Sequence, residues 1–384
     1  MIKYPMQQGQ KKIPIILFSI FIFLLFSQCQ NKYEALKSDV DVLIENEKFD
    51  SAKEKIKIKL EGLKSTDEII SSNKPKLPRI LEMSNDRNRI VWTEDKKIIF
   101  RDLANPVVKS KDIGELIEWV SVSSESEYAV LAIKLVNGSG CRLKTVSFFD
   151  SKDSYDSGAF VSCFNKGAIS TEGTKIYYFV DDNLYQEETK EPKKPILVIP
   201  KEKLISPFPK LKNKFSIFPI GKTFLIFSGN AGSYYLYWFS PKSNSIKILA
   251  KDILSPKIFH SDGKSVYAIG GTVGAMLLRE IKFTHSGEPN ITKGLPISQN
   301  EINPWSTTKK NEFISGNGDS VYKWGPGKKK QIYPIICERF WGVARDHIIY
   351  ENKKNELILA NTEFSLEDWK ILDLYKEVKK KKEK

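Results

Sequence analysis

The chain has 384 residues, with 61 Lys or Arg against 47 Asp or Glu, so its formal net charge is +14 at pH 7. A chain of this length can form two or three domains or one large repeat domain. The charge favours acidic partners, namely anionic lipid, polysaccharide or an acidic protein face, although solubility alone would also explain it. Length, composition and charge alone neither exclude nor identify a reaction.

The N-terminal segment has the layout of a secretory signal. Lys3, Lys11 and Lys12 form a basic region without acidic residues, and the 14 residues 13–26 (IPIILFSIFIFLLF) carry no charge. A membrane-spanning helix needs about 20 apolar residues, whereas the apolar region of a signal peptide needs about 7 to 15. Residues 1–28 are therefore predicted to be a signal peptide.

The residues that end this run resemble the lipobox of bacterial lipoproteins. In FSQC (26–29), the small residue Ser27 fits the pattern, while Gln28 stands where Gly, Ala or Ser is usual. The resemblance implies a lipoprotein with lipid on Cys29, anchored in the cell envelope and most simply at the outer membrane. A cleaved signal with a chance cysteine and an uncleaved anchor are the alternatives. Export argues against a nucleic-acid partner.

Residues 30–63 predict a helical hairpin, because apolar residues recur at spacings of three and four. The residues are Tyr33, Leu36, Val40 and Leu43, then Phe49, Ala52, Ile56, Leu60 and Leu63. The second half resembles half of a tetratricopeptide repeat, but one helix pair is not an array. We interpret residues 29–78 as the lipidated cysteine, a packed helical spacer and a linker at Ser71–Pro78.

From residue 79 the pattern changes to short apolar, β-branched and aromatic runs separated by turn residues, which predicts many short strands. Pairs of such strands recur about every 43 residues. They lie at 80–92, 119–132, 167–179, 216–227, 257–269, 303–314 and 339–350.

Third and fourth strands follow most of these pairs. Third strands are predicted at 96–103, 182–188, 234–240, 319–325 and 355–361, and fourth strands at 194–200, 245–250, 330–334 and 368–374. Seven units of four strands predict a mainly β protein, a seven-bladed β-propeller over residues 79–374 preceded by the short helical hairpin. A two-sheet sandwich is the alternative. Residues 375–384 are predicted to be a basic disordered tail.

Three of the hairpins, SNDRNRIVW, STEGTKIYYF and HSDGKSVYAI, are similar to the Ser-x-Asp-Gly-Lys hairpins of WD40-like repeats of the TolB type. In such a turn the Asp side chain caps the backbone and the Gly takes a positive φ. The resemblance implies the fold over residues 79–374. A lipid anchor joined to a propeller also resembles, in architecture, the lipoprotein propellers of the outer-membrane assembly machinery.

Aromatic residues fall at matching places in the first strands, which line the centre of a propeller. They are Trp119, Trp305, Trp341, Phe218 and Phe259. One interpretation is an aromatic pocket for a sugar or a peptide. The other is packing between blades, where large aromatic side chains commonly fill gaps.

The sequence shows no pattern for catalysis or metal binding. The three histidines, His260, His285 and His347, lack metal-ligand spacing, and no Gly-x-Ser-x-Gly elbow occurs. We therefore predict no catalytic residue, no metal and no cofactor.

Cys141 and Cys163 are predicted to form a disulfide. They lie symmetrically about a turn near residue 152, which would place them opposite each other in an antiparallel hairpin. Export permits disulfides, and Cys337 is expected to be buried.

Two functions remain. The first is a non-catalytic binding or scaffold module for a protein or polysaccharide partner, favoured by the anchor, the closed ring and the missing catalytic pattern. The alternative is a propeller-type envelope enzyme, a hydrolase or lyase, with groups from several blades gathered at the central channel.

Overall fold

The computed structural model describes most of the chain after residue 33. The described residues are 34–63, 68–104, 108–136, 140–148, 155–189, 194–207, 211–260, 265–284, 288–298, 304–307, 312–317, 320–326, 330–333, 335, 337–362, 371, 374, 375, 377, 378 and 381. They form two compact units: one runs from Ile69 to Thr362, and the other contains the described residues before and after it.

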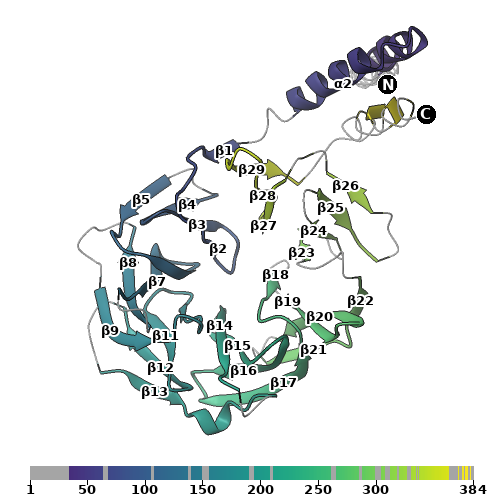
Figure 1. Ribbon diagram of the computed structural model, residues 1–384. Helices are drawn as coiled ribbons and strands as arrows, with labels where there is room; N and C mark the ends of the chain where they lie inside the picture. Colours follow the sequence, from purple (N-terminus) through teal and green to yellow (C-terminus); the bar gives the residue numbers. More distant parts are fainter. Residues whose placement is uncertain are drawn as a thin grey trace, which may run out of the picture. The chain divides into compact units, whose positions relative to one another are not determined.

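Antiparallel sheets make up the larger unit, and Figure 1 shows them side by side around a centre. Three four-stranded sheets come first: β2 (Leu81–Met83), β3 (Arg89–Glu94), β4 (Lys97–Asp102) and β5 (Val108–Asp112); β6 (Ile117–Val122), β7 (Tyr128–Lys134), β8 (Cys141–Ser147) and β9 (Tyr155–Val161); β10 (Ala168–Ile169), β11 (Lys175–Val180), β12 (Asn183–Glu188) and β13 (Ile196–Ile199). A short 3-10 helix, Lys201–Lys203, follows.

The later strands continue the pattern. They are β14 (Lys214–Ile220), β15 (Thr223–Asn230), β16 (Ser233–Ser240) and β17 (Ser245–Ile253); β18 (Phe259–His260), β19 (Ser265–Thr272), β20 (Ala275–Phe283), β21 (Pro289–Ile291) and β22 (Leu295–Ile297); β23 (Trp305–Ser306), β24 (Phe313–Asn317), β25 (Ser320–Trp324) and β26 (Gln331–Ile332); β27 (Arg339–Ala344), β28 (His347–Glu351) and β29 (Leu357–Asn361).

Strands β14 to β22 are connected as one nine-stranded sheet, but a single residue pair, Ile253 with Gly270, joins β17 to β19. Separating the strands there gives seven groups of described strands, whereas counting connected sheets gives six, so the number of seven blades stays a prediction. Each of the seven predicted hairpins is present in the described strands. We call each four-stranded sheet a blade. In the nine-stranded sheet, the strands before and after the pair of Ile253 with Gly270 are counted as two blades.

The turns between first and second strands have the predicted chemistry. The Asp86 carboxylate accepts a hydrogen bond from the backbone N–H of Asn88 (3.1 Å). The hydroxyls of Ser84 and Ser170 each accept backbone N–H bonds across their own turns. Gly173 has a φ of 75°, the left-handed conformation expected for glycine in this turn.

The last blade takes its outer strand from the N-terminal side of the chain. Strand β1 (Glu68–Ser71) pairs with β29, in the order β1-β29-β28-β27. The prediction of a fourth strand at 368–374 is therefore wrong for its described residues, 371 and 374, which are helical, and the predicted linker begins one residue later, after Ser71. The sequence EIIS places two β-branched residues in the strand that pairs, and pairing the two ends of the ring leaves no long open edge at the seam.

Arg79 binds both sides of this seam. Its buried guanidinium forms an ion pair with Glu351 of β28. It also donates hydrogen bonds to the backbone oxygen of Asn355 (2.8 Å) and to the hydroxyl of Ser71 (3.1 Å). One side chain thus connects β1, the last blade and the start of the first blade.

Glu94 extends this network into the first blade. Burial alone raises the pKa of the Glu94 carboxyl, but hydrogen bonds from Ser71, Asn73 and Trp92, together with the Arg79 charge, outweigh burial and lower it overall. The carboxylate is therefore held in its charged form at the seam.

Aromatic and aliphatic side chains pack between neighbouring blades. Phe100 of the first blade stacks on Phe148 of the second with ring centroids 4.7 Å apart, and Phe179 of the third stacks on Phe215 of the fourth at 4.5 Å. All four rings are buried. One blade cannot bury both of its faces alone, so its stability comes from contacts with its two neighbours.

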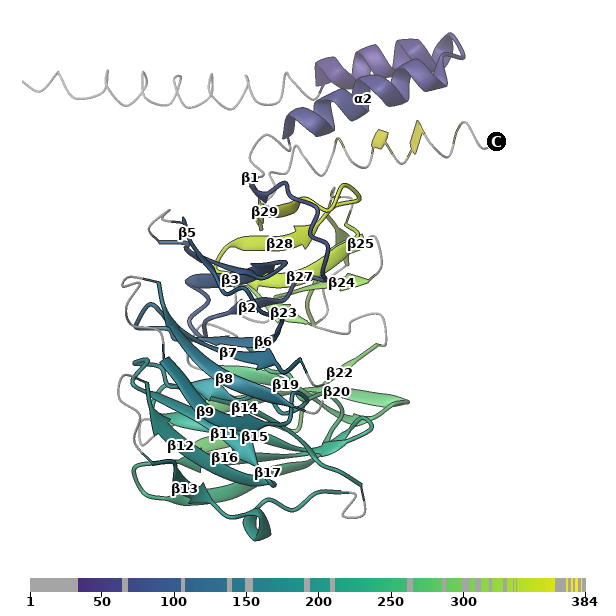
Figure 2. The same ribbon diagram turned by 60° about the vertical axis from the view of Figure 1, so that its left-hand side comes forward.

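The smaller unit is helical. Residues 34–45 and α2 (Phe49–Leu63) form the predicted hairpin, which Figure 2 shows as two helices side by side. Between them, Glu47 has a φ of 57° and the backbone N–H of Lys48 donates to the oxygen of Leu43 (2.8 Å). This is the left-handed end that commonly closes a helix.

The C-terminal segment completes this unit. Ile371, Leu374 and Val378 are helical and buried against a cluster from the hairpin that includes Val40 and Ile56. The prediction of a disordered tail over 375–384 is therefore wrong for the described residues within it. The apolar residues at spacings of three and four form a helical stripe, which the surrounding lysines obscure in the composition.

A disulfide joins Cys141 and Cys163, with Cα atoms 5.1 Å apart. The expected register differs, because Cys141 pairs with Val161 and the pairing shifts between Arg142 and Lys144. Cys163 therefore lies two residues beyond its expected place. With a sequence separation of 22 between the cysteines, the cross-link stabilises the fold by about 3 kcal/mol in the chain-entropy account.

Cys29 and the apolar residues 13–26 lie outside the described residues, so the signal peptide and the lipid stay predictions. Among the helices that the structure describes, none is both long enough and apolar enough to cross a membrane.

The Arg79 network leads to a prediction about ring stability. Replacing Arg79 with Met should lower the free energy of unfolding by about 3–5 kcal/mol, because it leaves a carboxylate unpaired in a largely buried site. Urea unfolding measures the change. As a control, Lys282→Met removes an exposed cation that lies 3.4 Å from Glu280 and should cost under about 1 kcal/mol. Equal small losses in both variants would contradict the role of Arg79 at the seam.

Candidate functional site in the central cavity

First strands from several blades converge on one cavity of about 550 Å³. Its walls come from β2, β14, β18, β23 and β27, and from the residues that precede β10 and β18. These inner strands face the centre of the ring in Figure 1. The cavity is therefore built from parts of the chain that are far apart in sequence.

Five aromatic residues line the cavity: Phe218, Phe259, Trp305, Phe340 and Trp341. Four of them are among the five aromatic residues singled out in the sequence, and Phe340 was missed. Phe259 and Trp305 meet edge to face with centroids 5.6 Å apart, a favourable aromatic geometry. Gly342 has a φ of 151°, and a Cβ there would lie 2.8 Å from Trp305, so glycine allows this ring to approach.

Trp119, the fifth predicted residue, does not line this cavity. Its side chain is buried in the apolar cluster between the second and third blades, which includes Val130 and Ile169. A Cβ on Gly167 would lie only 2.9 Å from the Trp119 ring. The position of Trp119 therefore fits the alternative interpretation, which is packing between blades.

Three cations and one carboxylate accompany the aromatic rings. Lys166 forms an ion pair with Glu82 (2.6 Å), and its ammonium also lies 5.3 Å from the centre of the Phe218 ring. The Arg339 guanidinium lies 3.7 Å from the centre of the Trp341 ring. Both are cation–π contacts.

Lys257 and Arg339 carry the excess charge. Within the described part of the chain, neither forms an ion pair. Loss of hydration lowers the pKa of Lys257, and the charges of Lys166 and Arg339 lower it further, although Glu82 acts in the opposite direction. Lys257 and Arg339 are both exposed, so the cavity is open to solvent at these two side chains. A cavity with unpaired positive charge is suited to an anion.

The sequence contains a signal for these cations that was not used. Lys257 precedes Phe259 by two residues, and Arg339 precedes Trp341 by two residues. Lys166 stands two residues before β10. A basic residue therefore lies at the start, or two residues before the start, of three inner strands.

Side chains of the turn between β2 and β3 form hydrogen bonds to blades that are distant in sequence. The Asn85 amide donates a hydrogen bond to the backbone oxygen of Pro219, and Arg87 donates one to the backbone oxygen of Ser306 (2.6 Å). Asn85 also lines the cavity. This turn of the first blade is thus fixed to the fourth and sixth blades, and it limits the cavity on its side.

Metal-binding geometry is not found in the part of the chain that the structure describes: no group of three or more His, Cys, Asp or Glu side chains is placed to hold an ion. His347 instead pairs with the neighbouring Asp346, with Nδ1 2.8 Å from the carboxylate.

No protein-family model matches the chain, and no curated protein matches it in sequence. Solved structures do match its fold. The crystal structure of the Cps50 (Swd1) β-propeller domain from Myceliophteria thermophila has a TM-score of 0.50 and 11% identity, and the match covers 77% of this chain and 100% of that one. The chain is a β-propeller.

Two other solved structures are also similar to the chain. A prolyl endopeptidase matches with a TM-score of 0.51 and 13% identity over 74% of this propeller's chain and 46% of its own. TolB from Acinetobacter baumannii matches with a TM-score of 0.39 and 12% identity over 73% and 63%. Identities this low show the fold alone, so neither an activity nor a partner follows from them.

The charges around Lys257 predict how its pKa responds to mutation. Its pKa should lie below the ordinary 10.5, and Lys166→Met should raise it, because the variant removes a nearby positive charge and frees Glu82 from its partner. Reactivity of individual lysines toward an acylating reagent, followed against pH by mass spectrometry, measures this shift. Lys97→Met, outside the cavity, is the control. A Lys257 profile that is the same in all three proteins would contradict the proposed coupling.

Proposed function

We propose that this propeller is a lipid-anchored, non-catalytic binding module of the cell envelope that holds an anionic group of a polysaccharide or protein partner in its central cavity. The observation that carries the proposal is the lining: three cations, one carboxylate and five aromatic rings around one cavity.

The arrangement fits an anion with an apolar body. A guanidinium such as Arg339 can bind a carboxylate through two parallel hydrogen bonds, and an ammonium such as Lys257 adds a point charge. A volume of about 550 Å³ lies within the usual range for small-molecule pockets, so one sugar unit or one side chain can enter with its neighbours outside.

The same lining supports binding over hydrolysis. Glycoside hydrolases usually place two carboxyl groups across the bond that they cleave. Among the described residues that line this cavity, Glu82 is the one carboxylate, and Lys166 already holds it. A hydrolase or lyase, the alternative function, would need further acid or base groups beside the bound ligand.

A matched pair of sugars tests the anion site. Methyl glucuronoside should bind the full chain more tightly than methyl glucoside, which differs at the C6 carboxylate. Arg339→Gln and Lys257→Gln should each weaken glucuronoside binding about tenfold, the effect of losing one charged hydrogen bond. Lys97→Gln should leave it unchanged. Titration calorimetry at two salt concentrations measures this, and equal affinity for both sugars would overturn the anion site.

The anchor is tested separately through Cys29. In the Cys29→Ala chain, lipid labelling should be lost and the protein should leave the membrane fraction, because the acyl chains supply the attachment. Protease treatment of intact cells then shows which face carries the natural protein. If the Cys29→Ala chain stays membrane-bound and uncleaved like the natural one, the lipoprotein proposal fails.

A further inference from the structure

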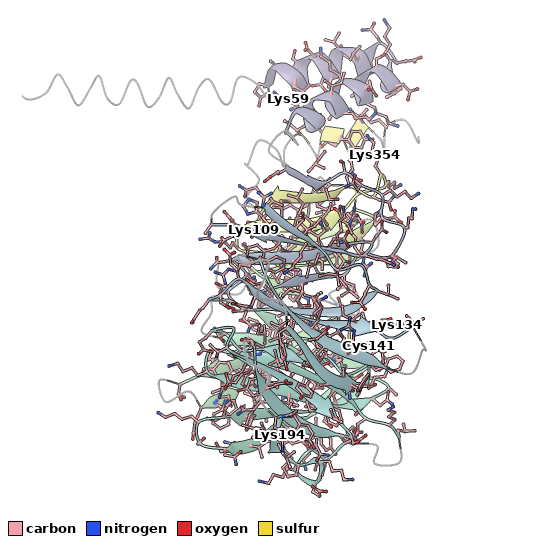
Figure 3. All side chains as sticks on the ribbon, turned by 90° about the vertical axis from the view of Figure 1, so that its left-hand side faces the viewer. Lys59, Lys109, Lys134, Cys141, Lys194 and Lys354 are labelled. Atoms are coloured by element: carbon pink, nitrogen blue, oxygen red, sulfur yellow. A yellow bond between two sulfur atoms is a disulfide. The ribbon has the colours of Figure 1, made fainter. Side chains whose placement is uncertain are left out.

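A second, larger hollow of about 1110 Å³ lies where the second and third blades meet. Its lining includes Lys134 at the end of β7, Phe160 and Phe164 at the end of β9 and beyond, and Asp181 and Asp182 in the turn after β11. Figure 3 shows Lys134 beside Cys141, its partner across the two strands. We call this hollow the groove.

Two phenylalanine rings are exposed along the groove. The side chains of Phe160 and Phe164 are 68% and 74% exposed. The backbone next to Phe164 is nevertheless fixed on both sides: Cys163 is held by the disulfide, and the buried Asn165 accepts a hydrogen bond from the backbone N–H of Phe215 (3.1 Å). An uncovered ring on a fixed backbone can serve as a contact surface, because the backbone loses little order when a ligand covers the ring.

Polar side chains complete the lining, and their charges balance. Lys134 pairs with Glu118 (3.0 Å), while Lys201 and Lys212 offset the charges of Asp181 and Asp182. Loss of hydration raises the pKa of Asp182, an effect that the Lys212 charge reduces. The groove therefore offers hydrogen-bond donors and acceptors beside flat apolar rings, without a net charge.

This combination matches neutral sugars more closely than apolar side chains. A sugar ring has an apolar C–H face that can cover a phenylalanine ring, and hydroxyls that both donate and accept hydrogen bonds. An apolar peptide side chain would instead bury the carboxylates and ammonium groups without replacing their hydrogen bonds, which is unfavourable.

The groove adjoins the central cavity through consecutive residues. Phe164 and Asn165 line the groove, and Lys166 lines the cavity. The backbone of Lys166 is hydrogen-bonded to β14 on both sides, to the oxygen of Phe215 (2.9 Å) and the N–H of Ile217 (3.1 Å). The Lys214 ammonium, 5.5 Å from the Phe164 ring centre, adds positive charge at this junction. Two residues span at most about 7 Å of chain, so a ligand longer than one sugar unit can reach both linings.

We propose that the groove is a carbohydrate-binding subsite continuous with the central cavity, so that one glycan chain places an acidic unit in the cavity and neutral sugar units over Phe164 and Phe160. The inference rests on the proposed anion site and identifies its ligand as a linear glycan. In this arrangement the cations of the cavity select the acidic unit, and the two rings favour glycans that are long enough to cover them.

Three probes separate this inference from the anion site. They are methyl glucuronoside, a glucose pentamer that ends in one glucuronate, and the neutral glucose hexamer. We expect the acidic oligomer to bind the full chain about tenfold more tightly than the single uronate, as aromatic contacts of this kind allow. Phe160→Ala and Phe164→Ala should remove that gain and leave uronate binding unchanged. Ile196→Ala, an exposed apolar residue outside the groove lining, is the matched control.

Each outcome is decisive. Equal affinity for the uronate and the acidic oligomer would overturn the groove subsite while leaving the anion site standing. Failure of all acidic probes would remove the anion site and the inference together. If an acidic Asp/Glu peptide of six residues gains affinity through Phe164 and the oligomer does not, the groove binds protein, and the glycan assignment is wrong. A gain that survives both Phe variants would also overturn it.

Discussion

Closure of the ring is the constraint on which the rest of the structure depends. Strand β1 pairs with β29, and Arg79 bonds to both sides of the seam. The central cavity takes Glu82 from the first blade and Arg339 from the last, so its charge and shape exist only when these two blades are adjacent. A seam built from the two ends of the propeller also makes closure depend on contacts across nearly the whole sequence, which disfavours a partly closed ring.

The cavity holds more positive charge than its own carboxylate can balance, and the surrounding contacts make this tolerable. Arg339 lies on Trp341, and Lys166 is shared between Glu82 and the Phe218 ring. Lys257 has no such partner within the described chain, and its pKa is lowered. A site that keeps like charges together lowers stability, and an anion would relieve the repulsion. Such local conflicts are expected at functional sites.

The sequence predicted the elements that depend on local chemistry. Turns such as Ser84–Asp86 and strands of alternating residues could be read directly, because a hairpin is specified by neighbouring residues. It did not predict β1, since EIIS forms a strand only when β29 lies beside it. It also did not predict the helical residues near the C-terminus, because their apolar side chains are buried only against the hairpin. The aromatic half of the site was found through repeat position. The cations were missed because a basic residue near the start of a first strand gains a role only when the blades bring Lys166, Lys257 and Arg339 together.

The segment from Cys163 to Lys166 shows how one short stretch can serve two surfaces. Its first residue is cross-linked to β8, its third is buried, and its last is hydrogen-bonded to β14. Between them Phe164 faces the groove, and Lys166 reaches the cavity. A disulfide and main-chain hydrogen bonds fix the backbone here, so its position does not depend on burial of the Phe164 ring. Because the disulfide needs an oxidising compartment, the proposed export would affect the geometry of both surfaces through the same pair of cysteines.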